Sequence, residues 1–248
     1  MTGVAHCIIL PSFNSGAALA RTVRAIAPSR LPVWVVIDAS TDGSEHALGA
    51  MEDGVRVIPL PKNGGKGTAV LVGMRAALEA GYTHALVMDA DGQHDVNSLL
   101  PFIRISMENS DAMVLGVPIF GPDAPMERVK GRRIGNWFAN FETHWLGVGD
   151  SLFGFRVYPI KQSLQIMESI RTARRFDFDT ELAVRLLWAG VRPINFETPV
   201  FYPHTDDGGV THFRYFRDNL LLIWTHARLI CGMVLRLPRL LRLRKEWA

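Results

Sequence analysis

HALVMDADGQHD, residues 84 to 95, runs an apolar segment directly into three acidic side chains. Residues 84–88 have the length and character of a buried strand, and Asp89, Asp91 and Asp95 follow at once. In an extended chain, residues i and i+2 point to the same side with their Cα atoms about 7 Å apart. We therefore expect Asp89 and Asp91 to face one point at the end of a strand.

Two carboxylates that face one point repel each other unless a cation lies between them. Mg²⁺ and Mn²⁺ suit such a site, because they bind one or two protein carboxylates together with substrate phosphate oxygens. Asp89 and Asp91 are therefore predicted metal ligands. The alternative is that Asp91 and Gly92 only form a turn, and for Asp95 that it is the N-cap of a helix that follows.

Short apolar runs alternate with helical patterns through the first half of the chain. The runs are residues 6–10, 33–37, 55–60 and 84–88, and the helical patterns are residues 17–27, 44–51 and 67–81, the last with Gly81 as expected C-cap. This alternation predicts an α/β fold with a mostly parallel sheet flanked by helices. Ligands bind such sheets beyond the carboxyl ends of the strands. The candidate site segments are residues 11–14, 38–42, 61–66 and 89–95.

Length and composition narrow the class of protein. The 248 residues, 48% of them hydrophobic, predict one large α/β domain with a tail. A net charge of +3 is too small for a dedicated nucleic-acid binder, so no nucleic-acid partner is expected. The two cysteines lie far apart without a CxxC motif, which fits a reducing cytosol, and the N-terminus lacks a signal-peptide pattern.

NGGKGT, residues 63–68, is a glycine-rich turn that contains a lysine. It does not match a P-loop, because Leu60 stands where the first glycine is required, and no G-x-G-x-x-G motif occurs in the chain. Its glycines still allow close backbone approach, and the helix that it opens favours anions at its N-terminus. We predict that Lys66 contacts a phosphate; the alternative is an ordinary turn with a solvated lysine.

Five ordered motifs resemble those of family 2 glycosyltransferases with the GT-A fold, in particular the branch that is similar to dolichyl-phosphate mannose synthase. They are PSFN (11–14), VVIDASTDGS (35–44), KNGGKGTAVLVGM (62–74), VMDADGQHD (87–95) and DSLFGFRVYP (150–159). The resemblance runs from about residue 6 to residue 213. It implies an enzyme facing the cytosol that uses a nucleotide-sugar donor, Mg²⁺ or Mn²⁺, and a lipid-linked acceptor, with inversion at the anomeric carbon.

The resemblance also assigns roles to single residues. Pro11 and Asp38 fall where the family holds the nucleoside, and Asp42 supports that loop. Asp89 and Asp91 match the Asp-x-Asp site for metal and diphosphate, and Arg156 matches an arginine that contacts phosphate. The chain departs from the family at two positions, Ser15 in place of a glutamate and Ile37 in place of an acid. These departures bear on the base and the sugar more than on the chemistry.

Two later segments carry further candidates. In residues 174–190, Asp179 and Glu181 match acids of the family, and a carboxylate near the acceptor oxygen acts as a base or an orienting group. For a phosphate acceptor, which is already ionised, the need for a base is weak. The alternative is that Asp179 is an N-cap and Glu181 a partner of the helix dipole. His212 resembles a histidine that contacts diphosphate or metal, and the alternative is a structural role.

The last part of the chain, residues 216–248, combines apolar and basic residues. Six Arg or Lys residues and no acid lie from Arg228 to Lys245. The longest runs without a histidine or a charge, residues 229–235 and the equally long 219–225, are much shorter than the ~20 residues that span a membrane. We predict an interfacial amphipathic helix with Trp224 and the six basic side chains at anionic headgroups. The alternative is a helix that packs on the core or on the partner in a homodimer.

The sequence as a whole predicts a GT-A glycosyltransferase domain, residues 1–215, and a membrane-associating tail, residues 216–248, peripheral on the cytosolic face of a membrane. The metal, Arg156 and Lys66 neutralise the departing nucleoside diphosphate in this interpretation. One alternative is a nucleotidyltransferase, which would release pyrophosphate. Another is a non-catalytic module that binds a nucleotide sugar or a membrane.

Overall fold

A single mixed sheet organises the chain. The computed structural model describes residues 3–44, 46–48, 54–122, 124, 126–170, 172–201 and 215–247. In these residues seven strands form one sheet in the order β3-β2-β1-β4-β6-β5-β7. Their bounds are β1 His6–Ser12, β2 Val33–Ile37, β3 Val55–Pro59, β4 His84–Val87, β5 Met113–Phe120, β6 Arg156–Pro159 and β7 Pro193–Val200. The four strands predicted in the first half, β1 to β4, are confirmed.

The direction of the strands places the candidate segments together at the carboxyl ends of the parallel strands. Strands β1 to β4 are parallel to one another, and β5 is parallel to β7. Only β6 is antiparallel to its neighbours among the described strands, and it lies between β4 and β5. The antiparallel strand β6 therefore begins beside the carboxyl end of β4, and residue 156 lies next to residue 87. The predicted mostly parallel sheet flanked by helices is confirmed.

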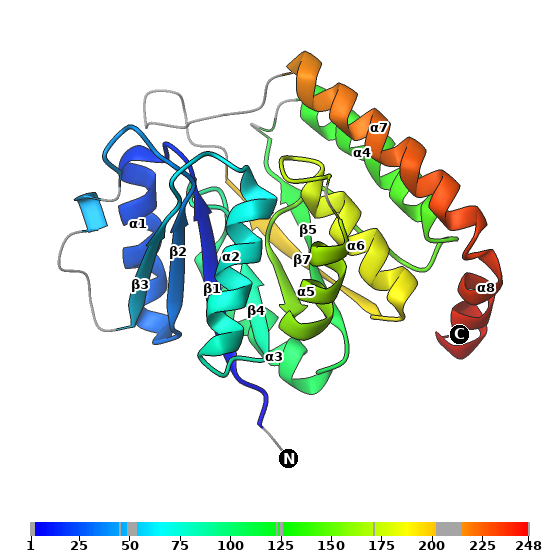
Figure 1. The fold of residues 1–248 in the computed structure, drawn as a ribbon, viewed down its shortest axis with the longest axis horizontal. Helices are drawn as coiled ribbons and strands as arrows, with labels where there is room; N and C mark the ends of the chain where they lie inside the picture. The colour runs from blue at the N-terminus through cyan, green and yellow to red at the C-terminus, as the bar shows by residue number, and fades with distance from the viewer. Residues whose placement is uncertain are drawn as a thin grey trace.

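Helices cover both faces of the sheet (Figure 1). They are α1 Gly16–Ile26, α2 Lys66–Glu79, α3 Leu99–Glu108, α4 Met126–Glu142, α5 Ile160–Ser169, α6 Phe178–Ala189, α7 Tyr215–Val234 and α8 Leu237–Trp247. Alternate residues of β1 enter different cores, because successive side chains of a strand point to opposite faces. Ile8 and Leu10 pack with α1 and α3, whereas Cys7 and Ile9 pack with α2, α5 and α6.

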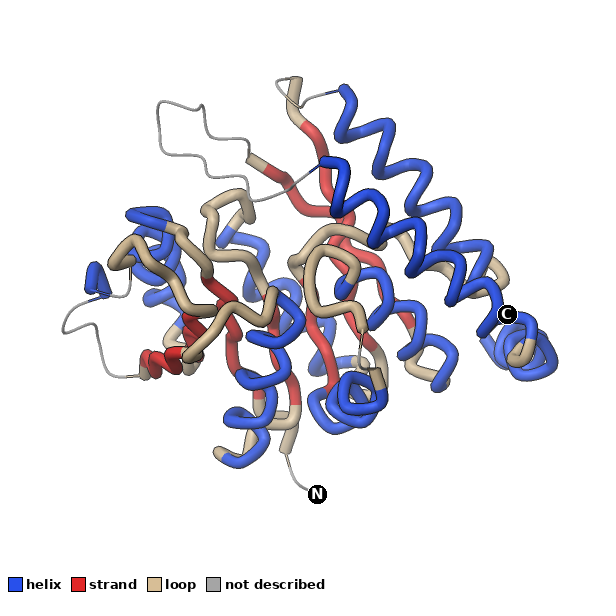
Figure 2. The backbone as a smooth tube through the Cα atoms, turned by 45° about the horizontal axis from the view of Figure 1, so that its top comes forward, coloured by secondary structure: helices blue, strands red, loops and turns tan. Residues whose placement is uncertain are grey.

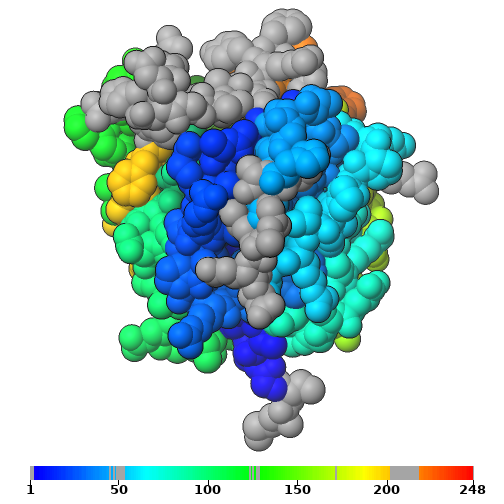
Figure 3. All heavy atoms as spheres, turned by 90° about the vertical axis from the view of Figure 1, so that its left-hand side faces the viewer, coloured from blue at the N-terminus to red at the C-terminus, as the bar shows by residue number. Residues whose placement is uncertain are grey.

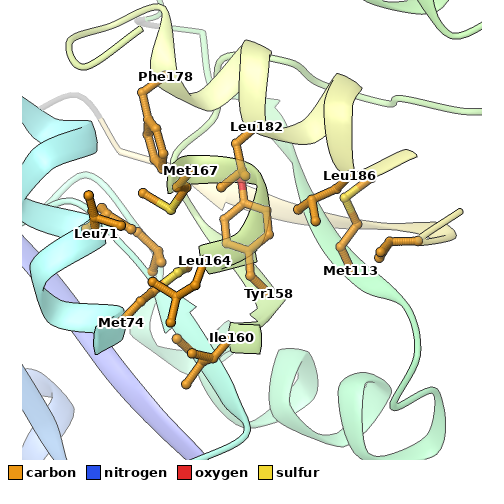
Figure 4. Close-up of a cluster of buried hydrophobic side chains, with 14 of the residues drawn as sticks. Leu71, Met74, Met113, Tyr158, Ile160, Leu164, Met167, Phe178, Leu182 and Leu186 are labelled. Atoms are coloured by element: carbon orange, nitrogen blue, oxygen red, sulfur yellow. The ribbon is translucent and has the colours of Figure 1, made fainter. Parts of the chain in front are cut away.

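The core between α2, α5 and α6 lies under the candidate segments at the carboxyl ends of the strands. Figure 4 shows side chains from these helices converging on Tyr158 of β6. The labelled members include Leu71 and Met74 of α2, Leu164 and Met167 of α5, and Phe178, Leu182 and Leu186 of α6. Close packing of this kind leaves little room for one helix to move without its neighbours. The position of α6 is therefore tied to α2 and to β6.

The crossover between β2 and β3 differs from the prediction. The helix expected over residues 44–51 is a three-residue 3-10 helix, His46–Leu48, in the part that the structure describes, and residues 45 and 49–53 lie outside it. Helix α2 ends one residue earlier than predicted, since Ala80 is its C-cap and Gly81 follows with φ of 90°. Figure 3 shows the side of the molecule that α1, β3 and α2 form, in blue to cyan.

The C-terminal helices pack on the domain instead of projecting from it. Helix α7 runs along α4 and also contacts α6 (Figures 1 and 2). Leu229 and Met233 of α7 and Leu240 of α8 are buried in the same core as α2 and α6. No single helix in the described residues is long and apolar enough to cross a membrane. Asp218–Val234 and Leu237–Trp247 together pass that test of length and composition, but the chain bends by 81° between them.

The basic residues of the tail divide into two groups, which corrects the expectation that all six face headgroups. Arg228 pairs with Glu181, Arg236 donates to the Gly232 carbonyl and lies over the Trp188 ring, and Arg239 donates to the Ala189 carbonyl. These three serve contacts within the fold. Arg242, Arg244 and Lys245 are exposed, as Arg239 also is, and Arg244 Nη1 lies 3.4 Å from His144 Nδ1.

A buried histidine predicts a loss of stability in mild acid. The His6 ring approaches Ser106 Oγ at 3.0 Å through Nε2, and burial, then the nearby His84, lower the pKa of His6 from 6.5 to about 4. Below pH 6.5 the unfolded chain therefore takes up a proton that the folded chain excludes. We expect the free energy of unfolding, measured in urea, to fall from pH 7 to pH 5, at most about 1.4 kcal/mol per pH unit from this group.

The variant His6→Gln should show a shallower decline over the same pH range. His46→Gln is the matched control, since His46 is exposed, and it should keep the wild-type slope. Parallel slopes for wild type and His6→Gln would contradict the assignment.

Candidate active site

The end of β2 holds the glycine-rich turn in place. The side chain of Asp38, which is buried, accepts hydrogen bonds from the backbone N–H of Gly64 at 2.7 Å and of Gly65 at 2.7 Å. Asn63 Nδ2 donates to the Asp38 carbonyl at 3.3 Å. Both oxygens of this carboxylate therefore bind the chain itself. Asp38, predicted at the nucleoside, shapes the loop in front of α2 in this structure.

The glycine-rich turn also docks against the segment before α6. The N–H of Gly67 donates to the Arg174 carbonyl at 2.8 Å. A Cβ at Gly65, where φ is 85°, would overlap with the Arg174 carbonyl oxygen, and one at Gly67 would lie 2.8 Å from the Phe178 ring. Only glycine allows so close an approach of the two backbones. The turn thus brings the start of α2 against the start of α6.

Lys66 connects two acids from distant parts of the chain. It is the first residue of α2, and its Nζ lies 2.7 Å from Asp89 Oδ1 and 2.7 Å from Asp179 Oδ2. Its side chain is only 16% exposed. Burial acts to lower the pKa of Lys66, but the charges of Asp179 and Asp89 outweigh it, so this pKa is raised. The alternative of a solvated lysine is therefore wrong.

Asp89 and Asp91 differ in their electrostatic surroundings. Burial acts to raise the pKa of Asp89, but Lys66 outweighs it and holds that pKa well below its usual range. The pKa of Asp91 is raised, first by burial and then by the negative charge of Asp89. Asp91 Oδ1 accepts a hydrogen bond from the N–H of Gln93 at 3.0 Å. One cation, Lys66, thus satisfies Asp89 but leaves the repulsion from Asp91 in place.

This pair of carboxylates fits a divalent cation that also binds substrate. No group of three or more His, Cys, Asp or Glu side chains is placed to hold a metal within the part of the chain that the structure describes. Mg²⁺ and Mn²⁺ do not need such a cage, because they complete their coordination with phosphate oxygens and water. Asp95 is not part of the pair. Its Oδ1 accepts from the Asn97 N–H at 3.1 Å, so the N-cap alternative is confirmed.

The last part of the loop between α4 and β6, residues 150–155, packs against Lys66 and Asp89. Asp150 anchors it, accepting from Arg132 at 2.6 Å and from the N–H groups of Leu152 and Phe153 at 2.9 and 2.7 Å. A Cβ at Gly154 would lie 2.5 Å from Asp89 Oδ2 and against Lys66 Nζ. The glycine of the G-F-R motif therefore lets the backbone of this loop touch the charged cluster.

Arg156, which is predicted to contact phosphate, lies inside the molecule. The side chain is 0% exposed. It donates to the carbonyls of Phe153 at 2.7 Å, Asp179 at 2.6 Å and Asp150 at 3.1 Å, and to the Tyr158 hydroxyl at 2.9 Å. A guanidinium so occupied holds the loop at residues 150–155 and the start of α6 together. It positions Asp179 through that residue's backbone.

His94 is a site residue that the sequence interpretation missed. Its ring is buried against Phe153 and Phe155, with centroids 4.8 and 5.1 Å apart, and its Nε2 lies 3.5 Å from Asp89 Oδ2. The signal was its place in DGQHD, directly after Gln93, whose N–H binds Asp91, but a lone histidine gives no partner from sequence alone. The structure shows that it faces the oxygen of Asp89 opposite to the one that Lys66 binds.

The two acids at the start of α6 point to different neighbours. Asp179 faces Lys66, and its Oδ1 accepts no hydrogen bond within the described residues although it is buried. The N-cap position belongs to Asp177, so the alternative that Asp179 caps the helix is wrong. Glu181 faces away from this cluster, with its oxygens 2.7 Å from Arg185 and 3.0 Å from Arg228. Only Asp179 of this pair joins the site.

Three predicted residues remain. Pro11 and Asp42 lie near the ends of β1 and β2, and the third is not among the residues that the structure describes. Pro11 is buried in β1 beside Val36. Asp42 accepts hydrogen bonds from Gly16 N at 2.8 Å and Ser44 N at 3.0 Å; partial burial opposes them, yet they lower the pKa of Asp42. Asp42 therefore ties the loop after β2 to α1. His212 lies outside the described residues.

The arrangement of strands, acids and glycine-rich turn matches a known family over most of its length. A model of Glycosyl transferase family 2 matches residues 7–163, more than half of the chain. The chain belongs to glycosyl transferase family 2. The chain is similar to an undecaprenyl-phosphate mannosyltransferase of Micrococcus luteus, 26% identical over 217 residues that cover 81% of this chain and 84% of that protein.

Two further relatives extend the comparison of this glycosyltransferase. The UDP-N-acetylglucosamine–dolichyl-phosphate N-acetylglucosaminyltransferase of Methanococcus voltae is 29% identical over 126 residues, which are 50% of this chain and only 50% of that relative. The glucosyl-3-phosphoglycerate synthase of Mycobacterium tuberculosis, solved with Mn²⁺, UDP-glucose and phosphoglyceric acid, superposes with a TM-score of 0.63 at 17% identity. The superposition covers 94% of this chain and 79% of that one, and it shows the GT-A fold.

The contact between the glycine-rich turn and Arg174 predicts unequal effects of two similar substitutions. Gly65 and Gly81 have φ of 85° and 90°, but only Gly65 faces another atom within 4 Å of the position of a Cβ. Gly81→Ala should cost about 1 kcal/mol of unfolding free energy from backbone strain alone. Gly65→Ala should cost clearly more, since it also separates the turn from the segment before α6. Equal losses in urea unfolding would contradict this docking.

Proposed function

We propose that this glycosyltransferase moves a sugar from a nucleotide-sugar donor to a lipid-linked phosphate acceptor, with a divalent cation and with inversion at the anomeric carbon. The observation that carries the proposal is the Lys66 ammonium between Asp89 and Asp179, beside the Asp91 carboxylate, whose pKa is raised by burial and then by the charge of Asp89. This cluster lies beyond the carboxyl ends of β1, β2 and β4, where α/β sheets bind their ligands.

The donor side of the site is formed by Asp89 and Asp91. Bound Mg²⁺ or Mn²⁺ at these carboxylates supplies positive charge to the donor diphosphate. The structural neighbour solved with Mn²⁺ and UDP-glucose supports a donor of this class. Lys66 adds a cation at the N-terminus of α2, where the helix dipole also favours anions. These groups face the charge that develops as the diphosphate leaves.

The acceptor side is formed by Asp179. In the transfer step an acceptor oxygen forms a bond to the anomeric carbon while the bond from that carbon to the diphosphate oxygen breaks, and the electron pair leaves with the nucleoside diphosphate. An ionised phosphate acceptor needs no base and would be repelled by a second anion, so Asp179 acts on the acceptor by orienting the Lys66 ammonium. Arg156 and Glu181 act by position, because both are fully buried in contacts with the protein.

The acceptor class rests on the relatives and on the outer surface of the molecule. The names of two relatives specify dolichyl phosphate and undecaprenyl phosphate as acceptors. Large apolar side chains are exposed on neighbouring helices, Ile134 and Trp137 on α4 and Leu220, Ile223 and Trp224 on α7. Arg242 and Lys245 of α8 add exposed positive charge. This surface suits the interface of an anionic membrane on its cytosolic face.

Removing one charge from the metal pair should abolish turnover. Asp91→Asn keeps the size of the side chain and its hydrogen bond to Gln93 but lowers the affinity for a divalent cation. We expect loss of nucleoside diphosphate release and of Mn²⁺-dependent donor binding, with the fold intact by circular dichroism. Asp95→Asn is the control and should stay active, because Asp95 only caps a 3-10 helix. Activity of Asp91→Asn in saturating Mg²⁺ and Mn²⁺, or release of pyrophosphate by the wild type, would refute the proposal.

The proposed membrane contact of α7 is tested by comparing an exposed apolar residue on α7 with one on α3. Ile223 on α7 and Leu100 on α3 are 65% and 59% exposed. Ile223→Gln should lower the fraction of protein that sediments with anionic liposomes, since it removes an apolar group from the interface. Leu100→Gln should sediment like the wild type. Raising the salt concentration should weaken binding further by screening Arg242 and Lys245. Equal behaviour of both variants would place the membrane contact elsewhere.

A further inference from the structure

The first turn of α6 contacts the active site and the C-terminal helix at once. Toward the site, the Asp179 carboxylate binds Lys66 at 2.7 Å and its carbonyl accepts from Arg156 at 2.6 Å. Successive residues of an α-helix are rotated by about 100°, so Asp177 and Glu181, four apart, share a face and Asp179 points to the opposite one. The face that carries Asp177 and Glu181 is turned toward α7.

Helix α7 holds that face through two side chains one turn apart. Arg228 lies 3.0 Å from Glu181 Oε2, and Thr225 Oγ1 donates to Asp177 Oδ2 at 3.3 Å. Arg228 also donates to Thr225 Oγ1 at 3.0 Å and to Thr172 in the loop before α6. Glu181 is fully buried and Asp177 nearly so. Buried charged contacts resist displacement, because separating them leaves a charge without a partner.

A displacement of this turn moves Asp179 by the same amount. Asp177, Asp179 and Glu181 lie within one helical turn, whose backbone is closed by the hydrogen bond from Glu181 N to the Asp177 carbonyl at 3.1 Å. Catalytic groups lose much of their effect when they are misplaced by about 1 Å. The tail is therefore placed to act on the acceptor-side carboxylate without touching it.

We propose that Arg228 is a positioning residue for Asp179. By holding Glu181 and the loop before α6, it fixes the turn that presents Asp179 to Lys66, so that the seating of α7 on the domain sets the geometry of the acceptor side. The inference rests on the proposed function for its catalytic consequence. It gives the C-terminal helix a part in the reaction besides contact with a lipid surface.

The test compares two arginines that join the tail to α6 at opposite ends. Arg228 contacts the first turn, and Arg239 donates to the Ala189 carbonyl at the last turn, at 2.6 Å. With Mn²⁺, a nucleotide-sugar donor and a short water-soluble polyprenyl phosphate, Arg228→Gln should lower kcat at least tenfold and leave the KM of the donor unchanged. Arg239→Gln should keep kcat within about twofold of the wild type, since it loosens the tail far from Asp179.

The fold of the Arg228 variant is protected by a second ion pair. Glu181 keeps Arg185 at 2.7 Å, so Arg228→Gln does not leave the buried carboxylate without a cation. Arg228→Lys, which restores a charge at this position, should recover part of kcat. If Arg228→Gln fails to fold, Thr225→Val takes its place with the same expected loss of kcat, because it removes the hydrogen bond to Asp177 and leaves every ion pair intact.

Hydrogen exchange gives a readout that does not depend on turnover. The Glu181 amide should exchange faster in Arg228→Gln than in the wild type, and not in Arg239→Gln. Equal losses of kcat in both variants, or a raised donor KM with intact kcat in Arg228→Gln, would overturn the proposal. If the wild type transfers no sugar to any polyprenyl phosphate while the difference in exchange appears, the proposed function fails and the coupling of Arg228 to the α6 turn stands.

Discussion

The active site depends on the two ion pairs that the Lys66 ammonium makes with Asp89 and Asp179. Asp89 follows β4, Asp179 lies on α6, and Lys66 opens α2, so one cation joins three parts of the fold whose residues lie up to 113 positions apart. Two carboxylates this close to each other and to a low-dielectric core would raise each other's pKa without it. The backbone around the cluster is built to admit the lysine. Gly154 leaves no side chain between the loop and Lys66, and Gly65 and Gly67 let the start of α2 reach the segment before α6.

Several charged residues near this cluster bind the backbone of the segments that support it. Asp38 binds the glycine-rich turn with both oxygens, and Asp150 binds the backbone of the loop that covers Lys66. Arg156 connects that loop to the carbonyl of Asp179. A buried charged group must be satisfied by hydrogen bonds, and these three use loop backbone to do so. The position of Lys66 therefore depends on Asp38, Asp150 and Arg156, which hold the loops around it. The residue type alone does not tell such a supporting charge from one that binds a ligand.

Local pattern predicted the parts of the fold that local physics determines. The apolar runs predicted β1 to β4, and the helical pattern from Gly67 to Gly81 predicted α2 to within two residues of its end. What sequence could not supply was partners at long range. The contact of Lys66 with Asp179, the burial of Arg156, and the position of His94 beside Asp89 all depend on where β6 and α6 meet β4. The antiparallel direction of β6 decides that meeting, and nothing in its four residues marks it.

The tail shows why composition alone left two interpretations open. An amphipathic helix predicts one apolar face, but α7 carries two, since Leu229 and Met233 are buried in the core while Leu220, Ile223 and Trp224 are exposed. The basic residues of the tail divide in the same way. Arg228 of α7, and Arg236 between α7 and α8, contact the domain, whereas Arg242, Arg244 and Lys245 of α8 are exposed. Packing on the core and contact with a lipid surface are therefore compatible properties of one helix. Under the proposed membrane contact, a force on the exposed face of α7 would reach the domain through its buried face, which a tail that only anchors the protein cannot do.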